Sequence, residues 1–499
     1  MKNEKLFDQF PPVSTKEWMD KIRSDLKGAD FHKKLVWKTN EGFEVKPFYR
    51  MEDTENLMYI NTLPGEFPYI RGNKINNNNW YVRQSIEVSD YVEANRKALT
   101  ILMKGVDSLG FIITDPESVC ESNFIILLDG ILIENIELNF LCEGKAKEIL
   151  DLISVITAER GLDPSAINGA IEADPVSRLM LNGELCVPVE AGFDYLASLT
   201  GSASLFPNLR TIHQNALHFS NGGADIVQEL AFGISMGCEY MNQLTVRGLS
   251  PNLAASKIRF SFSIGSRYFP EIAKLRAARL LWSVVTSAFR PENIEGIKMN
   301  IHCVTGKWNK TVYNPYVNML RTQTEAMSAI LGGTDSLTVE PFDIVFRQPD
   351  EFSERIARNQ QLILKEESFF DKVADPAAGS YYIENLTNLI ADHAWKLFVE
   401  IEDKGGFLES LKSGLIQKKI SESAMKRKID IASGKEVLLG TNLFPDLSEK
   451  APPDIEMDRI FKHHDTKSDL LIEPIIFFRG SEEYERLRIE AEKGAKKRL

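Results

Sequence analysis

Short apolar runs and longer segments with helical periodicity alternate along most of the chain. From Trp80 onward, each run of apolar or β-branched residues is followed by a stretch in which apolar residues recur every three or four positions. The first pattern predicts strands and the second predicts helices. We expect strands at residues 81–87, 110–113, 136–142, 167–173, 210–214, 239–244, 297–303 and 336–339. We expect helices at residues 91–108, 144–160, 190–200, 223–236, 270–289 and 314–331.

The residues at the helix ends agree with these segments. Pro270 stands at an expected first helical position and Glu271 in the first turn, where the helix dipole favours a negative charge. Gly332-Gly333 and Gly405-Gly406 follow helical runs and suit the left-handed residue that ends many helices. Eight strands alternating with helices predict an α/β fold, specifically a closed (β/α)8 TIM-type barrel. A doubly wound open sheet remains the alternative, because alternation alone does not establish closure.

The pattern divides the chain into three regions. Residues 1–75 show no sustained period and contain a turn-rich stretch, Pro64-Gly65-Glu66-Phe67-Pro68. We expect them to form an N-terminal arm for subunit contact, whose apolar surface comes from Phe43, Phe48, Tyr49, Phe67 and Tyr69. Residues 76–407 are the expected barrel. Residues 408–499 are an expected helical C-terminal segment, with a linker-like break at Ala451-Pro452-Pro453.

Composition and charge exclude several classes of function. The net charge of −12 argues against nucleic acid as a partner, because phosphate binding needs a basic face. No apolar run approaches the roughly 20 residues that span a bilayer, and the charged N-terminus is unlike a secretory signal. The five widely spaced cysteines predict neither disulfides nor a structural metal site. We therefore expect a cytoplasmic protein without a membrane partner and without a bound metal.

Several long motifs, in order along nearly the whole chain, resemble the methylmalonyl-coenzyme-A mutase family. The arm carries Asp25-Leu26-Lys27-Gly28 and a stretch from Pro64 to Gly72, and the barrel region carries Trp80-Tyr81-Val82-Arg83-Gln84. Three further motifs follow: Glu271-Ile272-Ala273-Lys274-Leu275-Arg276-Ala277-Ala278-Arg279, Arg355-Ile356-Ala357-Arg358-Asn359 and Asp375-Pro376-Ala377-Ala378-Gly379-Ser380-Tyr381-Tyr382. The basic residues of the 271–279 motif are read as structural, either solvated or paired with acids.

The resemblance also shows which catalytic positions this sequence lacks. The family's first-strand tyrosine falls on Ser85, and its substrate-carboxylate arginine falls on or next to Asn182. A neutral amide cannot replace a fixed charge with a bidentate fork. An upstream glutamine becomes Glu172, and the Tyr-His pair of the fifth strand becomes Leu217-His218. The segment that faces the adenosyl and corrin groups becomes residues 338–345, without its histidine and glutamate.

The family's cobalamin-binding flavodoxin-like domain has a cobalt-ligating signature, Asp-x-His-x-x-Gly, which does not occur in this sequence. The nearest look-alike, His463-His464-Asp465, has no glycine three residues beyond its histidine, so we interpret it as a surface loop. His218 is the one retained catalytic-type residue, and we interpret it as a hydrogen-bonded histidine at the barrel end rather than a catalyst. Arg71, Arg83 and Gln84 are weak candidates for binding a coenzyme-A thioester.

The resemblance thus implies a small, non-catalytic subunit that supports a large catalytic subunit in a heterodimer. The complex would interconvert methylmalonyl- and succinyl-coenzyme A, with adenosylcobalamin bound by the large subunit and no cofactor on this chain. An independently active mutase using a separate cobalamin domain and an acyl-coenzyme-A-binding module remain the alternatives, and a homodimer of the isolated chain stays open. We also expect side chains to block the barrel axis, including His213 or Gln214 and His302 or Ile301.

Overall fold

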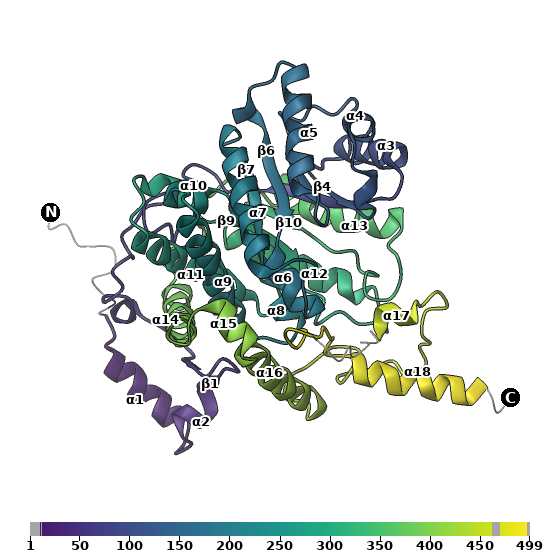
Figure 1. The fold of residues 1–499 in the computed structure, drawn as a ribbon. Helices are drawn as coiled ribbons and strands as arrows, with labels where there is room; N and C mark the ends of the chain where they lie inside the picture. The colour runs from purple at the N-terminus through teal and green to yellow at the C-terminus, as the bar shows by residue number, and fades with distance from the viewer. Residues whose placement is uncertain (1–9, 11, 462–469, 497–499) are drawn as a thin grey trace, which may run out of the picture.

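Eight parallel strands close into a barrel in the computed structural model, which describes residues 10, 12–461 and 470–496 (Figure 1). The strands are hydrogen-bonded in the order β10-β3-β4-β5-β6-β7-β8-β9. The closed barrel is confirmed, and the open sheet is ruled out. The strands are β3 (Tyr81–Val88), β4 (Ser108–Ile113), β5 (Glu137–Leu141), β6 (Asn168–Ala173), β7 (Leu209–Asn215), β8 (Ile258–Ile264), β9 (Asn300–Thr305) and β10 (Ser336–Thr338).

Helices surround the barrel and bury one stripe each against it. Long helices follow most strands, and their bounds agree with the expected segments to within a few residues at most ends. They include α3 (Tyr91–Leu102), α5 (Ala146–Glu159), α7 (Val189–Ser202), α9 (Ile226–Val246), α11 (Tyr268–Ala288), α12 (Val317–Leu331), α13 (Glu351–Leu362) and α14 (Tyr381–Asp403). Shorter helices are α4 (Glu121–Leu128), α6 (Pro175–Asn182), α8 (Leu217–Asn221) and α10 (Pro251–Ser256).

One predicted strand is wrong. Residues 239–244 lie inside α9, and the sixth barrel strand is β8, which was not predicted. Helix α9 packs on α11 and α14 as well as on the barrel, so 16 of its 21 residues are buried. A helix that is buried on most sides loses its polar stripe, and a short apolar stretch of it then resembles a strand. In β8, polar residues face the barrel interior, so the sequence of this fully buried strand lacks the apolar run that predicts one.

At the second position of strand β6, only glycine fits. Gly169 has a φ of +149°, and a Cβ built on it would lie 1.8 Å from the Leu138 carbonyl oxygen on β5. The pairing of β6 with β7 then shifts register between Ala170 and Ala173. The glycine therefore lets β5 and β6 approach each other closely. The register shift that follows changes the direction in which the later side chains of β6 point.

The N-terminal region divides into two parts. Residues from the β1–β2 hairpin (Trp37–Lys38 and Glu44–Val45) to Asn79 pack on the chain's own barrel, where Phe43 and Tyr69 are 6% and 1% exposed. Asn73 and Lys74 donate to the carbonyl oxygens of Met299 and Thr334, just before β9 and β10. The expected apolar surface is thus partly buried within the chain. Residues 69–79 cover the amino-terminal end of the barrel, whereas the β1–β2 hairpin packs beside α9 and α14.

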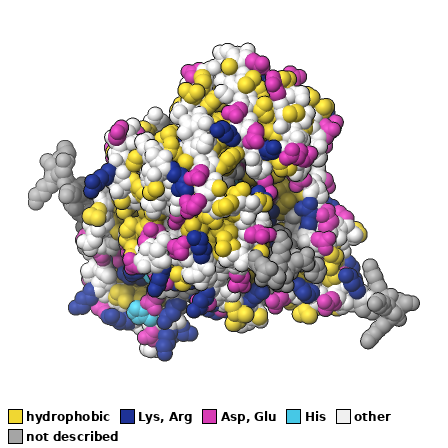
Figure 2. Space-filling view, viewed as in Figure 1, with side chains coloured by type: hydrophobic (Ala, Val, Ile, Leu, Met, Phe, Trp, Pro, Cys, Tyr) yellow, Lys and Arg dark blue, Asp and Glu magenta, His cyan; other side chains and the backbone are white. Residues whose placement is uncertain are grey.

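Helix α1 (Thr15–Asp25) is different, because it buries none of its residues. Trp18 stacks on Phe48 at 5.3 Å between ring centroids yet remains 45% exposed. Figure 1 shows α1 and α2 (Phe31–Leu35) at the edge of the molecule, and basic side chains gather over this corner in Figure 2. The outer part of the arm therefore carries the exposed surface that was expected of the whole arm.

The C-terminal region is helical in part. It contains α15 (Phe407–Lys412), α16 (Leu415–Ala432), α17 (Met457–Ile460) and α18 (Glu482–Lys496). The break expected at Ala451-Pro452-Pro453 lies in a non-helical stretch between α16 and α17. The look-alike His463-His464-Asp465 lies outside the described residues.

Candidate functional site

Charged side chains occupy the barrel interior. Arg83 on β3 and Glu172 on β6 form an ion pair of 2.7 Å, with side chains 7% and 4% exposed. Because β3 and β6 are three strands apart in an eight-stranded barrel, the pair spans the lumen. The Nδ1 atom of His213 on β7 lies 3.4 Å from the other Glu172 carboxylate oxygen. We call these three residues the first lumen bridge.

A second lumen bridge crosses the barrel between β8 and β5. Arg259 contacts Glu137 at 2.5 Å, and the two side chains are 0% and 2% exposed. The same guanidinium donates to Asn139 and, over 2.8 Å, to Asn300. His302 contacts Ser336 at 2.8 Å on the neighbouring strand. Of the side chains expected on the axis, His213 and His302 thus join the polar interior, whereas Gln214 contacts Met236 on helix α9 outside the barrel.

The charges of the first lumen bridge are fixed by its surroundings. Burial raises the pKa of the Glu172 carboxyl, but Arg83 and His213 lower it more strongly, and it falls to about 2. Burial lowers the pKa of His213, and Glu172 opposes this only in part. Burial, together with Arg83 and Arg259, also holds the pKa of His302 well below its usual range. At neutral pH the lumen therefore contains ionised Glu172 beside Arg83, with neutral histidines around them.

These pKa values predict how stability depends on pH. The folded pKa of Glu172 is depressed from 4.5, so its stabilising contribution is complete above 4.5 and is lost as the pH falls toward 2. The folded pKa of His213 is also depressed, so unfolding takes up its proton below about 6.5. The free energy of unfolding should therefore fall from pH 7 to pH 3, by up to about 1.4 kcal/mol per pH unit for each group. Urea titrations at several pH values measure this slope, and a flat profile would contradict it.

The sequence-based binding candidates do not converge on one site. Arg71 lies in the arm, where it contacts Asp375 at 3.1 Å and the Thr62 carbonyl oxygen. Gln84 faces away from Arg83 and contacts Glu354 and Arg358 on α13. Only Arg83 enters the lumen. Its guanidinium pairs with Glu172, and the other two candidates make their contacts elsewhere, so the three do not form one binding site.

The positions of the missing catalytic residues also separate. Ser85 shares the lumen face of β3 with Arg83, and both lie beside Gly110, which leaves room for them. Asn182 is exposed at the end of α6, and Leu217 and His218 begin α8 after β7. His218 stacks on Phe477 at 5.5 Å with an interplanar angle of 14°. No catalytic arrangement of these four positions is visible in the part of the chain that the structure describes.

The motif at residues 271–279 is structural, as interpreted. Lys274 contacts Glu229 at 2.7 Å, Arg276 contacts Glu384 at 2.8 Å, and Arg279 donates to the Gly332 carbonyl oxygen at 2.7 Å. All three cations are at most 2% exposed. They join α11 to α9, to α14 and to the loop before β10. Lys274 and Arg276 pair with acids as expected, Arg279 is held by backbone carbonyl oxygens, and the solvated reading is wrong.

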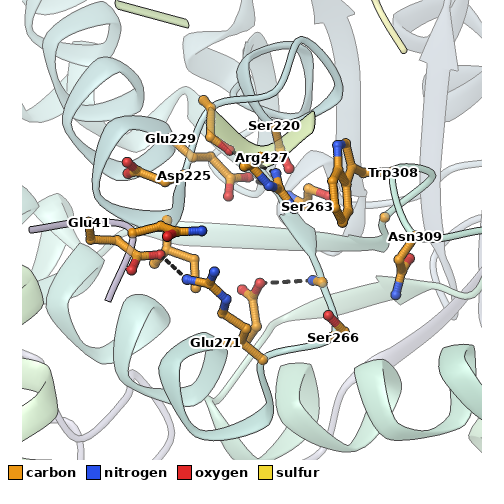
Figure 3. Close-up of a pocket in the computed structure, with 16 residues that line it drawn as sticks. Glu41, Ser220, Asp225, Glu229, Ser263, Ser266, Glu271, Trp308, Asn309 and Arg427 are labelled. Carbon is orange, nitrogen blue, oxygen red and sulfur yellow. Dashed lines mark hydrogen bonds and ion pairs between the residues drawn. The ribbon is translucent and has the colours of Figure 1, made fainter. Parts of the chain in front are cut away.

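A small polar cavity lies at the carboxyl ends of β8 and β9, the end where barrel enzymes place their active sites (Figure 3). Glu41 from the arm hairpin contacts Arg267, and Glu271 accepts from the Gly265 N–H at 2.8 Å. Burial and the nearby Glu41 raise the pKa of Asp225 to about 6. The cavity of about 50 Å³ is far below the roughly 300 Å³ that small-molecule pockets usually need. Its charged groups therefore join the arm, barrel and α16 rather than bind an acyl thioester.

No group of three or more His, Cys, Asp or Glu side chains among residues 10, 12–461 and 470–496 is placed to hold a metal ion. None of the helices within those ranges is long and apolar enough to cross a membrane.

The sequence analysis missed Glu137, Asn139 and Arg259 as lumen residues. The available signal was alternation, because Glu137 and Asn139 share one face of β5 and Arg259 shares a face with Ser261 and Ser263 on β8. Charged residues at alternate positions of a buried strand must meet a partner inside the barrel. For β8 the signal could not be used, because the strand itself was missed.

The comparisons with known proteins point to one family. The family described as methylmalonyl-CoA mutase matches residues 38–120 and 118–470. The chain is 46% identical to a Porphyromonas gingivalis protein named methylmalonyl-CoA mutase small subunit, over 99% of this chain and 79% of that protein. It is 35% identical to methylmalonyl-CoA mutase of Rhizobium meliloti over 84% of this chain, and 33% identical to the human mitochondrial enzyme over 88%. The chain spans 62% of the length of each of the last two.

Proposed function

Because this chain belongs to the methylmalonyl-CoA mutase family, we propose that it is the small, non-catalytic subunit of a two-chain mutase. The observation that carries the proposal is the first lumen bridge. In active members a coenzyme-A thioester would occupy the axis that Arg83 and Glu172 span here. The scaffold is retained, while the path that a substrate needs is occupied by the chain's own charges.

The adenosylcobalamin of such a complex would be bound by the large subunit, where it supplies the radical that rearranges the acyl group. The residues of this chain do not fit the cofactor. Residues 338–345, which by resemblance would face the corrin, lack the family's histidine and glutamate, and Val345 and Phe346 pack against Ile460 and Ile489 instead. What this chain contributes is a rigid barrel against which the catalytic barrel packs, with an interface of the size that obligate dimers need.

The isolated chain should be colourless and without mutase turnover when it is expressed with cobalamin present. The cause is the absence of the cobalt-ligating signature from this sequence together with the filled lumen. Co-expression with a large subunit should give a stable complex that is active and carries corrinoid at one site per heterodimer. Absorbance spectra and a methylmalonyl-CoA assay measure both. Stoichiometric corrinoid on the isolated chain, or turnover by it, would overturn the proposal.

We propose that α1 makes contact with the large subunit. It exposes Trp18 and buries no residue within its own chain, and tryptophan is a frequent anchor of protein interfaces. Deleting residues 1–28 should weaken association at least tenfold and leave the melting temperature of the barrel unchanged, because the arm from Trp37 onward still covers the barrel.

Analytical ultracentrifugation of the mixed subunits measures this association. The matched control is Leu205→Ala, which truncates a 71% exposed apolar residue at the end of α7. Full association of the shortened chain would show that α1 is not part of the interface.

A further inference from the structure

Residues 470–480 cross the carboxyl-terminal mouth of the barrel, which we define by the loops after β6, β7 and β9. The crossing is held by backbone hydrogen bonds to all three loops. Leu471 and Ile472 donate to the Gly183 carbonyl oxygen, Ile475 donates to Met180 at 2.8 Å, Phe478 donates to Asn221 at 3.1 Å, and Gly480 donates to Trp308 at 2.8 Å. We call residues 470–480 the strap.

Side chains of the strap fit the mouth closely. Ile472 and Ile475 are each 5% exposed and belong to the main apolar core. A Cβ built on Gly222 would lie 2.6 Å from Ile475, and one built on Gly223 would lie 2.8 Å from the Phe478 ring. Gly223 also has a φ of +101°, which disfavours any other residue. The two glycines after β7 therefore form a floor on which the strap and α16 both pack closely.

The far end of the strap is pinned by a buried charge. Arg479 donates to the Lys310 carbonyl oxygen at 3.1 Å and to Glu485 on α18 at 2.7 Å. The strap is thereby joined to α18, and α18 contributes Ile489 to the cluster over Val345 and Phe346 after β10. The cover thus extends from the loop after β6 to the loop after β10.

The space left at the mouth is small. A cavity of about 230 Å³ remains beside the strap, lined by Ile344, Val345 and Phe477 among others. Pockets that hold drug-sized ligands are roughly 300–1,000 Å³, and a corrin ring is larger than most such ligands. The mouth in this form therefore admits neither a corrin ring nor the domain that carries it.

We propose that the strap is an intramolecular cover that closes the barrel mouth against a cobalamin-bearing domain. The cover keeps the apolar floor around Gly222 and Gly223 from docking such a domain, whether free or presented by a partner. The part of the proposal that concerns a partner rests on the proposed function, because it assumes that the large subunit carries the cobalamin-bearing domain. It follows that the large subunit contacts this chain elsewhere and keeps its own cofactor domain on its own barrel.

Hydrogen–deuterium exchange of the full chain tests the cover directly. In the wild type, the amides of Ile472, Ile475, Phe478 and Gly480 should exchange at least a hundredfold more slowly than in an unstructured peptide. The double substitution Ile472→Ser/Ile475→Ser should accelerate exchange at least tenfold in residues 470–480 and 217–223. Exchange in β4 and β5 should not change. The matched control is Ile476→Ser, at a position that is 49% exposed.

The same variants, mixed with the large subunit, separate this inference from the proposed function. The strap variant should bind the large subunit as the wild type does, because the strap packs against its own chain. Fast exchange of the wild-type strap would overturn the inference, and so would loss of the complex in a strap variant whose barrel exchange is normal. Failure of the wild-type chain to form any complex would instead refute the proposed function and leave the cover itself intact.

Discussion

Replacing Gly169 with alanine is expected to lower the free energy of unfolding by about 4 kcal/mol or more, a loss seen only at special positions. A methyl group at this position would lie 1.8 Å from a backbone oxygen of the neighbouring strand, and backbone atoms cannot move aside as a flexible side chain can. The residue would also be held at a φ of +149°, which is strained for any side chain. Strands β5 and β6 would have to separate, so we expect an insoluble or unfolded product.

Gly201→Ala is the matched control for this substitution. Gly201 lies near the end of α7 with an ordinary helical φ, and the nearest atom to a new Cβ would be 3.8 Å away. Alanine should stabilise the protein there by up to about 1 kcal/mol, because glycine is the poorer helix former. Soluble yield and urea titration compare the two variants. A Gly169→Ala protein with a wild-type midpoint would show that β5 and β6 are not as close as described.

Glu172→Gln is expected to destabilise the chain by about 3–5 kcal/mol at pH 7, the usual cost of breaking a buried ion pair. The substitution leaves the Arg83 guanidinium in the lumen without its counter-charge, where its side chain is only 7% exposed. The variant should also lose the part of the pH dependence between pH 4.5 and pH 2 that the glutamate supplies. Glu87→Gln, at an exposed position of the same barrel strand as Arg83, is the control and should change little.

Removing both charges gives a sharper test of the same bridge. Arg83→Met/Glu172→Leu should recover most of the lost stability, since apolar replacements of buried pairs are often neutral or stabilising. The coupling energy from the double-mutant cycle should exceed about 1 kcal/mol, as for other residues in direct contact. Purely additive losses would mean that the two side chains do not interact across the lumen.

Seven of the eight strands could be predicted because their residues alternate or form short apolar runs between clear turns. Strand β8 was missed for a physical reason. The interior of this barrel is polar, so the lumen side of β8 reads Arg259, Ser261, Ser263 and looks like the exposed face of a surface segment. The same polar interior was invisible from the sequence, since pairing of β3 with β6 requires knowing how the barrel closes.

The candidate catalytic positions were easier to assign from the sequence than the contacts. Ser85, Asn182 and Leu217 could be compared with a family pattern one position at a time, which needs no structure. The burial of the arm was harder to predict, because the sequence does not distinguish its buried aromatic residues from its exposed ones. Tyr69 is 1% exposed and Trp18 is 45% exposed, and only the packing of residues 37–79 on the rest of the chain separates them.

The two lumen bridges also constrain how this sequence can change over generations. A substitution at position 83 alone leaves Glu172 uncompensated, and one at position 259 does the same to Glu137. Lineages should therefore replace these residues in pairs, in a single step or through a rare intermediate. Positions 83 and 172, and positions 137 and 259, should covary among close relatives of this chain.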